Sequence, residues 1–184
     1  MISPLSILLL AAALVALVVA TVSDLRERII PDVLVLTVLC AGVALRLTSA
    51  GISWLTPVIG IFVFLAMSFQ AAHRIVGGGD AKMMTAVTFL FPPGRVALML
   101  MMIALAGGIL SLAYLGARFA LKAYGWERAP ATSNPGFLRT EAARAAAGAP
   151  LPFAFAIFAG VACTVLLELT PCFSAISSST SCSL

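Results

Sequence analysis

Long apolar runs recur along this chain of 184 residues, and they constrain its fold more than any other feature. A helix of about 20 apolar residues is long enough to cross a hydrocarbon core of roughly 30 Å. Runs of this kind are expected near residues 3–22, 30–47, 54–72, 75–91, 96–115 and 150–170. A segment that spans lipid must satisfy its own backbone hydrogen bonds, so each run is expected to be an α-helix. The sequence therefore predicts an all-α integral membrane bundle of six transmembrane helices, forming one domain over residues 1–184.

The composition supports a membrane protein, and the placement of charge suggests its orientation. Hydrophobic residues make up 62% of the chain and charged residues only 10%, whereas soluble domains are about 45–50% apolar. If the N-terminus is outside, all but Arg46 and Arg95 of the 11 lysines and arginines fall on the inner side. Loops on the cytoplasmic side carry such an excess. The formal charge of +4 thus reflects topology, and no nucleic-acid partner is expected.

The first apolar run is expected to be a retained helix rather than a cleaved signal peptide. A signal peptide carries positive charge before its apolar region. Here Met1–Pro4 contains no basic residue, and Arg26 and Arg28 follow the run instead. We therefore expect the first helix to remain in the protein, with its N-terminus outside.

Two polar segments are expected outside the helices. Residues 116–149 are interpreted as an inner-side loop, and residues 171–184 as an outer, Ser-rich tail. Cys172 and Cys182 lie in that tail, where a disulfide is permitted in an oxidising compartment; two free thiols are the alternative. In the fifth helix, Gly107 and Gly108 are small enough to predict a close contact with another helix.

Three glycines and an acid, Gly77, Gly78, Gly79 and Asp80, interrupt the apolar sequence. An ionisable residue beside membrane segments is costly and usually marks a functional site. Glycines let another part of the chain approach closely. Asp80 is expected at the start of the fourth helix, as an N-cap or first-turn acid. The run is therefore the first candidate for the functional site.

The predicted topology brings a second acid to the same membrane face. Asp24 follows the first helix, which descends, and Asp80 precedes the fourth, which ascends. Two aspartates that converge in a partly dry site share a proton and titrate as a coupled pair. Such a pair can hydrolyse a peptide bond, with one carboxylate as general base and the protonated partner as general acid. The alternative is that Asp24 only marks a helix end and Asp80 only caps a helix.

Other residues compete for roles near this pair. Asp32 is a possible partner for Asp80, but directly after Pro31 it also fits an ordinary first-turn acid. Lys82 is expected to hold Asp80 ionised or to bind a polar group of a substrate. The single His73 and the absence of a C-x-x-C spacing predict no metal site and no cofactor.

The motifs themselves are similar to those of a known family. Ser23–Arg26 followed by Ile30–Asp32, and then Gly77–Lys82, resemble the two signature motifs of the type IV prepilin peptidases. These are aspartic membrane proteases with a GxGD active site. Leu151–Ile157 resembles the start of the family's last span. The resemblance covers nearly all six predicted helices.

The resemblance implies a function and a set of site residues. It implies an aspartic endopeptidase of the cytoplasmic (inner) membrane that removes the basic leader peptide from a prepilin or pseudopilin on the cytoplasmic side. Asp24 and Asp80 match the catalytic pair. The glycines of the run match the active-site turn, and Lys82 matches a motif lysine. The negative charge of Asp24, Glu27 and Asp32 is expected to receive the basic leader.

The chain also departs from the family pattern. Asp32 stands where the family commonly has Asn, and Ala154 stands where it usually has Gly. The longer members carry an N-terminal region with paired C-x-x-C motifs that is associated with N-methylation. The chain resembles the short form found in tight-adherence pilus systems, so cleavage without methylation is expected.

Two other functions stay open at this point. Presenilin-like and signal-peptide-peptidase-like proteases share GxGD, but their first aspartate usually follows a Tyr inside a span, whereas Asp24 follows Ser23. A small proton-coupled transporter or channel also uses acids at the membrane face. Ion flux that depends on Asp80, without peptide cleavage, would favour transport.

Overall fold

The computed structural model describes residues 4–27, 30–49, 53–73, 76–123 and 153–169, and over these residues the chain is all-helical. The helices in this described part are α1 (Pro4–Glu27), α2 (Asp32–Ser49), α3 (Leu55–Ala72), α4 (Gly78–Thr88), α5 (Pro93–Ala123) and α7 (Phe153–Leu169). The predicted helical class is confirmed. The tail with Cys172 and Cys182 lies outside the described residues, as does most of the predicted inner-side loop.

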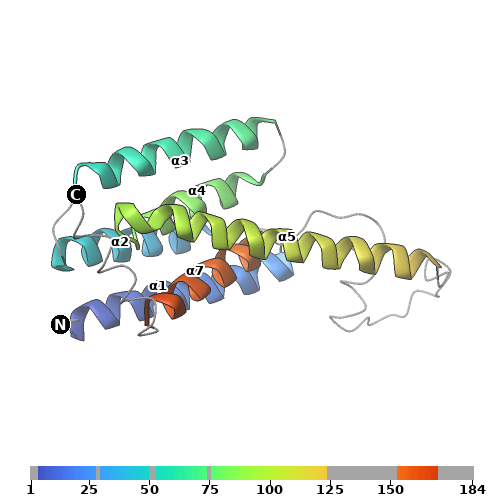
Figure 1. Ribbon diagram of the computed structural model, residues 1–184, viewed down its shortest axis with the longest axis horizontal. Helices are drawn as coiled ribbons and strands as arrows, with labels where there is room; N and C mark the ends of the chain where they lie inside the picture. Colours follow the sequence, from blue (N-terminus) through green and yellow to red (C-terminus); the bar gives the residue numbers. More distant parts are fainter. Residues whose placement is uncertain (1–3, 28–29, 50–52, 74–75, 124–152, 170–184) are drawn as a thin grey trace, which may run out of the picture.

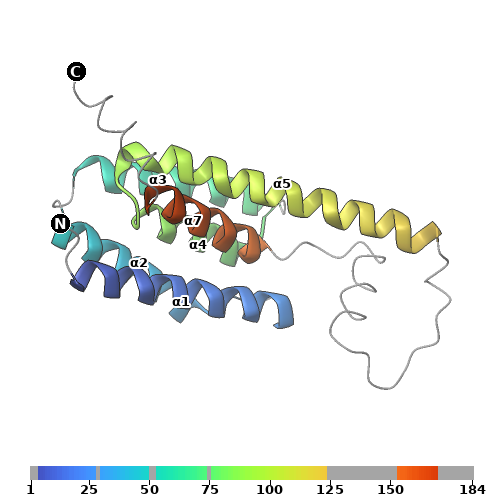
Figure 2. The same cartoon turned by 60° about the horizontal axis from the view of Figure 1, so that its bottom comes forward.

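The helices lie side by side and alternate in direction (Figures 1 and 2). As a result α1 ends, and α2, α4 and α7 begin, at one end of the bundle. We call this the glycine end, defined by Glu27, Asp32, Gly78 and Phe153. Motifs far apart in the sequence therefore meet there.

Two helices continue past the points where the sequence predicts that their spans end. The span predicted to end at residue 22 belongs to a helix that reaches Glu27, and the one predicted to end at residue 115 reaches Ala123. A charge ends a membrane span but not a helix, because Arg, Lys and Glu are good helix formers. Residues 116–123 of the predicted inner-side loop are therefore helical, and α5 extends beyond the other helices (Figure 1).

Three of the helices are long and apolar enough to cross a membrane: α1, α3 and residues Pro93–Ala120 of α5. Helix α7 is apolar but shorter. Helix α4 has 11 residues, about 16 Å at 1.5 Å per residue, which is too short for a hydrocarbon core of roughly 30 Å. The fourth predicted span is thus a half-length helix, while the count of six spans and the outside N-terminus stay predictions.

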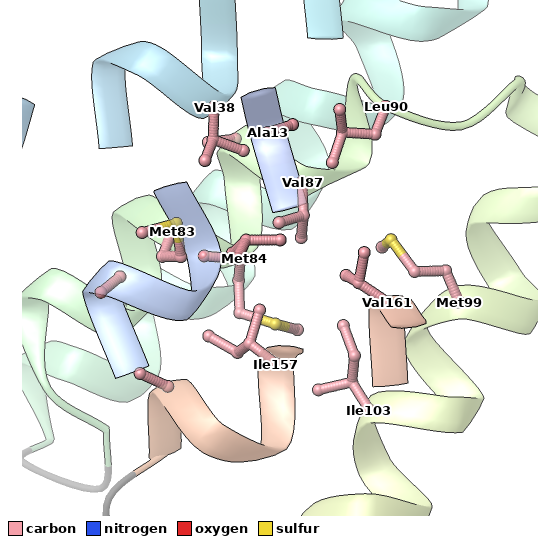
Figure 3. Packing of buried hydrophobic residues seen from close by; sticks show 14 of the residues in the cluster. Ala13, Val38, Met83, Met84, Val87, Leu90, Met99, Ile103, Ile157 and Val161 are labelled. Carbon is pink, nitrogen blue, oxygen red and sulfur yellow. The ribbon is translucent and has the colours of Figure 1, made fainter. Parts of the chain in front are cut away.

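Although it is short, α4 lies at the centre of the bundle. It packs against α2, α3 and α7, and Met83, Met84 and Val87 are among its buried residues. Figure 3 shows these side chains in one core cluster with residues from other helices, namely Val38 of α2, Met99 and Ile103 of α5, and Ile157 and Val161 of α7. This packing holds α4, and the glycine run that begins it, in a fixed position.

Among the described glycines, the one with the closest approach of another helix is Gly160, which was not predicted from the sequence. A Cβ on Gly160 of α7 would lie 2.5 Å from the Cα of Ile103 on α5. At Gly107, by contrast, a Cβ would lie 3.5 Å from the Phe153 ring, and at Gly108 it would meet nothing within 4 Å. A small residue lets two backbones approach closely, so Gly160 makes the tightest of these α5–α7 contacts. Of the predicted pair, Gly107 faces α7 at ordinary contact distance and Gly108 does not face it.

Candidate active site at the glycine end

A cavity of about 280 Å³ opens where the predicted motifs meet. It is lined by Asp24, Ile30, Asp32, Gly77, Gly78, Gly79, Asp80 and Lys82. Every residue selected from the sequence lines it except Glu27, which is the exposed last residue of α1. The two predicted acids, 56 positions apart in the sequence, therefore share one cavity.

Asp24 is held by the start of α7. It is buried in the last turn of α1, and its Oδ2 accepts a hydrogen bond from the Ala154 N–H at 3.2 Å. The first N–H groups of a helix have no partner within the helix, so Asp24 satisfies one of those of α7. Nearby, the Thr21 hydroxyl donates to the carbonyl oxygens of Leu17 at 2.8 Å and Ala154 at 3.4 Å. These contacts tie α7 to the end of α1.

Asp80 reaches back to the residue that precedes its own helix. It lies in the first turn of α4, as predicted, and Gly77 is the N-cap. The Gly77 N–H donates to the Asp80 carboxyl, in the manner of an acid at the third position of a capping box. The other oxygen, Oδ1, is buried and has no hydrogen-bond partner among the described residues. A buried oxygen without a donor is rare in native structures and calls for an explanation.

The surroundings of Asp80 favour its neutral form. Asp80 lies outside the three helices that are long enough to cross a membrane. Burial, the largest cause, and the negative charge of Asp24 raise the pKa of Asp80 to about 6, against the lowering effect of the Gly77 hydrogen bond. A carboxyl with this raised pKa keeps its proton up to a higher pH than an ordinary aspartate, and the protonated form can act as a general acid.

Two of the three glycines have close neighbours that a side chain at the same position would crowd. A Cβ on Gly77 would lie 2.9 Å from Asp80 Oδ2, and one on Gly79 would lie 3.2 Å from the Ile30 Cβ. A Cβ on Gly78 would meet nothing within 4 Å. The run therefore keeps space for the Asp80 carboxyl and for the Ile30 side chain, rather than supplying an unusual backbone shape.

Lys82 pairs with Asp32, whereas the sequence predicted it beside Asp80 or on a polar group of a substrate. Its Nζ lies 2.8 Å from Asp32 Oδ1, across α4 and α2. Asp32 is the first-turn acid of α2, as predicted. The two side chains are 51% and 75% exposed, so the pair contributes at most about 1 kcal/mol to stability. The pair marks the solvent-facing rim of the cavity and leaves Asp80 without a cation from Lys82.

Three residues that shape this site were not predicted from the sequence. Ile30 was not selected, although it lines the cavity. Thr21 lies three positions before Asp24, which places both on one face of α1. Ala154 was noted only for its departure from the family pattern, because no sequence signal shows which acid its backbone N–H contacts. Among the described residues, no group of three His, Cys, Asp or Glu side chains is arranged to hold a metal ion.

Comparison with known proteins points to one family. A model of the type IV leader peptidase family matches residues 11–112, more than half of the chain. The matched part runs from α1 into α5 and contains both Asp24 and Asp80. No curated protein and no solved structure matches the chain.

Proposed function

Since the chain belongs to the type IV leader peptidase family, we propose that it is a membrane-embedded aspartic endopeptidase with Asp24 and Asp80 as its catalytic pair. Its substrate is a prepilin or pseudopilin, whose leader is removed at the cytoplasmic face of the inner membrane. The predicted excess of positive charge on the inner side supports this location.

One observation carries the proposal: two aspartates from different helices share a cavity, and one of their oxygens is buried with no hydrogen-bond partner in the part of the chain that the structure describes. In a purely structural pair, such an oxygen would normally accept a hydrogen bond. In a hydrolase it is accounted for by a group that arrives with the substrate. The scissile carbonyl, or the water that attacks it, would fill this place.

The reaction needs only the two carboxyls and one water. The ionised carboxyl removes a proton from water as the water oxygen bonds to the scissile carbon, and the protonated carboxyl gives its proton to the carbonyl oxygen. When the resulting diol collapses, the carbon–nitrogen bond breaks. The leaving nitrogen takes the proton held by the first carboxyl, and a hydroxyl proton returns to the second. Both carboxyls end in the states in which they began.

The exposed acids suggest how a basic leader is received. Glu27 ends α1 at the glycine end and is exposed, and Asp32 lies at the rim of the cavity. Lys82 offsets part of the Asp32 charge through its ion pair. A cationic side chain of the leader would exchange with Lys82 at Asp32, or bind Glu27 directly. We assign these residues to substrate binding rather than to the chemistry.

Co-expression with candidate prepilins from the same genome tests the proposal. Mass spectrometry of the pilin N-terminus distinguishes a cleaved leader from an intact one. Cleavage that requires both Asp24 and Asp80 would support the assignment. Intact substrates together with an ion flux that depends on Asp80 would favour the transporter alternative and overturn it.

The glycine run supplies a prediction with a matched control. Gly77→Ala pushes the new Cβ against the Asp80 carboxyl, 2.9 Å away, and is expected to lower the cleavage rate by about 10- to 100-fold, because small displacements of a reacting group are costly. Gly78→Ala meets nothing within 4 Å and is expected to cleave normally. Equal rates for the two variants would show that the fit at Gly77 is unimportant.

The pH dependence of cleavage is a further prediction. Cleavage needs one protonated carboxyl, and Asp80 has a pKa raised to about 6 by burial and by Asp24. The kcat/KM for a prepilin peptide is therefore expected to fall as the pH rises through about 6, by about tenfold per further pH unit. It is measured with purified protein in detergent or liposomes. A constant kcat/KM up to pH 9 would contradict the assignment of a titrating acid.

A further inference from the structure

The two carboxyls of the cavity lie in unequal surroundings. Asp24 Oδ2 receives the Ala154 N–H, a donor at the N-terminal end of α7, where the helix dipole is positive. Hydrogen bonds from such donors favour the charged form of a carboxyl. Asp80 also accepts one backbone N–H, from Gly77 at the start of α4, but its Oδ1 is buried without a donor among the described residues. A buried oxygen without a partner disfavours charge.

From this difference we propose that α7, through the Ala154 N–H, makes the pair asymmetric: Asp24 is the ionised base and Asp80 is the protonated acid. The catalytic part of this inference rests on the proposed function, whereas the two protonation states can be measured without it. Ala154 is then a positioning residue, since it acts through Asp24.

The other charged groups around the cavity do not reverse this asymmetry. Asp32 is the third acid of the lining, and Lys82 pairs with it. Arg26 and Glu27, in the last turn of α1, are both exposed. Besides Asp32, the titratable groups on the described parts of the helices that pack against α4 are His73 at the end of α3, Cys40 and Arg46 of α2, and Cys163 and Glu168 of α7. None of these five lines the cavity.

The start of α7 also has the rigidity that a positioning element needs. Ala154 is 2% exposed, and its carbonyl oxygen accepts from Thr21, so the same residue contacts α1 through both its N–H and its C=O. Further along α7, the close contact between Gly160 and Ile103 fixes the helix against α5. The Ala154 N–H therefore has little freedom to leave Asp24.

Carbon-13 NMR titration of the aspartate carboxyls in micelles measures the two states directly. Asp24→Asn and Asp80→Asn assign the signals. We expect the carboxyl chemical shift of Asp24 to change mostly at the lower of the two midpoints. The carboxyl chemical shift of Asp80 should change mostly near pH 6. Removal of the N–H by Ala154→Pro, which the first turn of a helix tolerates, should raise the Asp24 midpoint by about one pH unit.

Two further variants separate the hydrogen bond from the shape of the residue. Phe155→Pro places a proline ring in the same turn of α7, as Ala154→Pro does, but keeps the Ala154 N–H. It should therefore leave the Asp24 midpoint unchanged. An ester in place of the amide at residue 154 removes the N–H and keeps the methyl side chain, so it should act like Ala154→Pro. The ester decides the question if the proline variant does not fold.

An Asp24 midpoint above that of Asp80 in the wild type, or one unchanged by the ester, would overturn the inference. The pH profile of cleavage gives a second test. The ester should move the midpoint of the acidic limb to a higher pH and leave the midpoint of the alkaline limb unchanged. A shift of the alkaline limb instead would assign the acid role to Asp24. If no prepilin is cleaved, the proposed function fails, and the titration still decides the protonation states.

Discussion

Asp80→Asn is expected to lower the rate of leader removal by about 1,000-fold or more while leaving the fold intact. The amide has nearly the same shape, and its oxygen can still accept the Gly77 N–H that the carboxyl accepts. It cannot release and recover a proton, and general acid–base catalysis contributes about 10²- to 10⁴-fold. The rate is measured by mass spectrometry of the pilin after reconstitution with purified enzyme.

Asp24→Asn is expected to have an effect of the same size, because its amide oxygen can still accept the Ala154 N–H but cannot remove a proton from water. Asp32→Asn is the matched control. It changes an exposed acid of the same cavity to the residue that the family commonly has. Because Asp32 is assigned to substrate binding and not to the chemistry, kcat should be retained and only the KM for a basic leader should rise. If Asp32→Asn were as damaging as the other two, Asp32 would be the partner of Asp80 instead of Asp24.

Gly160→Ala is expected to give the largest loss of stability of any change discussed. The new Cβ would lie 2.5 Å from backbone atoms of Ile103, so α5 and α7 must move apart, and overpacking of this kind costs about 1–3 kcal/mol. The displacement of α7 also carries Ala154 away from Asp24, so cleavage should fall. The midpoint of thermal unfolding in detergent measures the first effect, and the prepilin assay measures the second.

Gly108→Ala makes the same chemical change on the facing helix α5, where a Cβ would meet nothing within 4 Å. Because Ala favours a helix over Gly by about 1 kcal/mol, this variant should be as stable as the wild type or slightly more stable. A Gly160→Ala protein that melts at the wild-type temperature would show that α5 and α7 are not packed as closely as described.

The sequence predicted where helices occur better than where they end. The apolar runs gave the helices, since length and hydropathy are local properties. Charged residues that follow the predicted first and fifth spans, such as Arg26 and Arg118, lie inside α1 and α5, because Arg, Lys and Glu side chains also favour a helix. Pro92 indicated that the fourth helix is short, because it interrupts the apolar sequence soon after the glycine run and directly precedes α5.

At the site, the sequence predicted which residues meet but not what each one contacts. Alternating helices brought Asp24 and Asp80 to one end, and topology alone was enough for that. The partners depend on side-chain packing and on backbone donors, which leave no local pattern. Lys82 thus forms an ion pair with Asp32, and the Ala154 N–H donates a hydrogen bond to Asp24. The catalytic roles of the two acids stay a proposal.

Cross-linking in native membranes tests most directly whether Asp24 and Asp80 face each other across one cavity. The four cysteines of the chain are first replaced by alanine, and Asp24→Cys and Asp80→Cys are then introduced together. A thiol reagent that spans less than about 10 Å is expected to join the two positions. It should fail for Asp24→Cys with Glu168→Cys, because Glu168 lies near the far end of α7, about 20 Å along the helix from Ala154. Failure to join positions 24 and 80 in correctly inserted protein would contradict the paired-acid site.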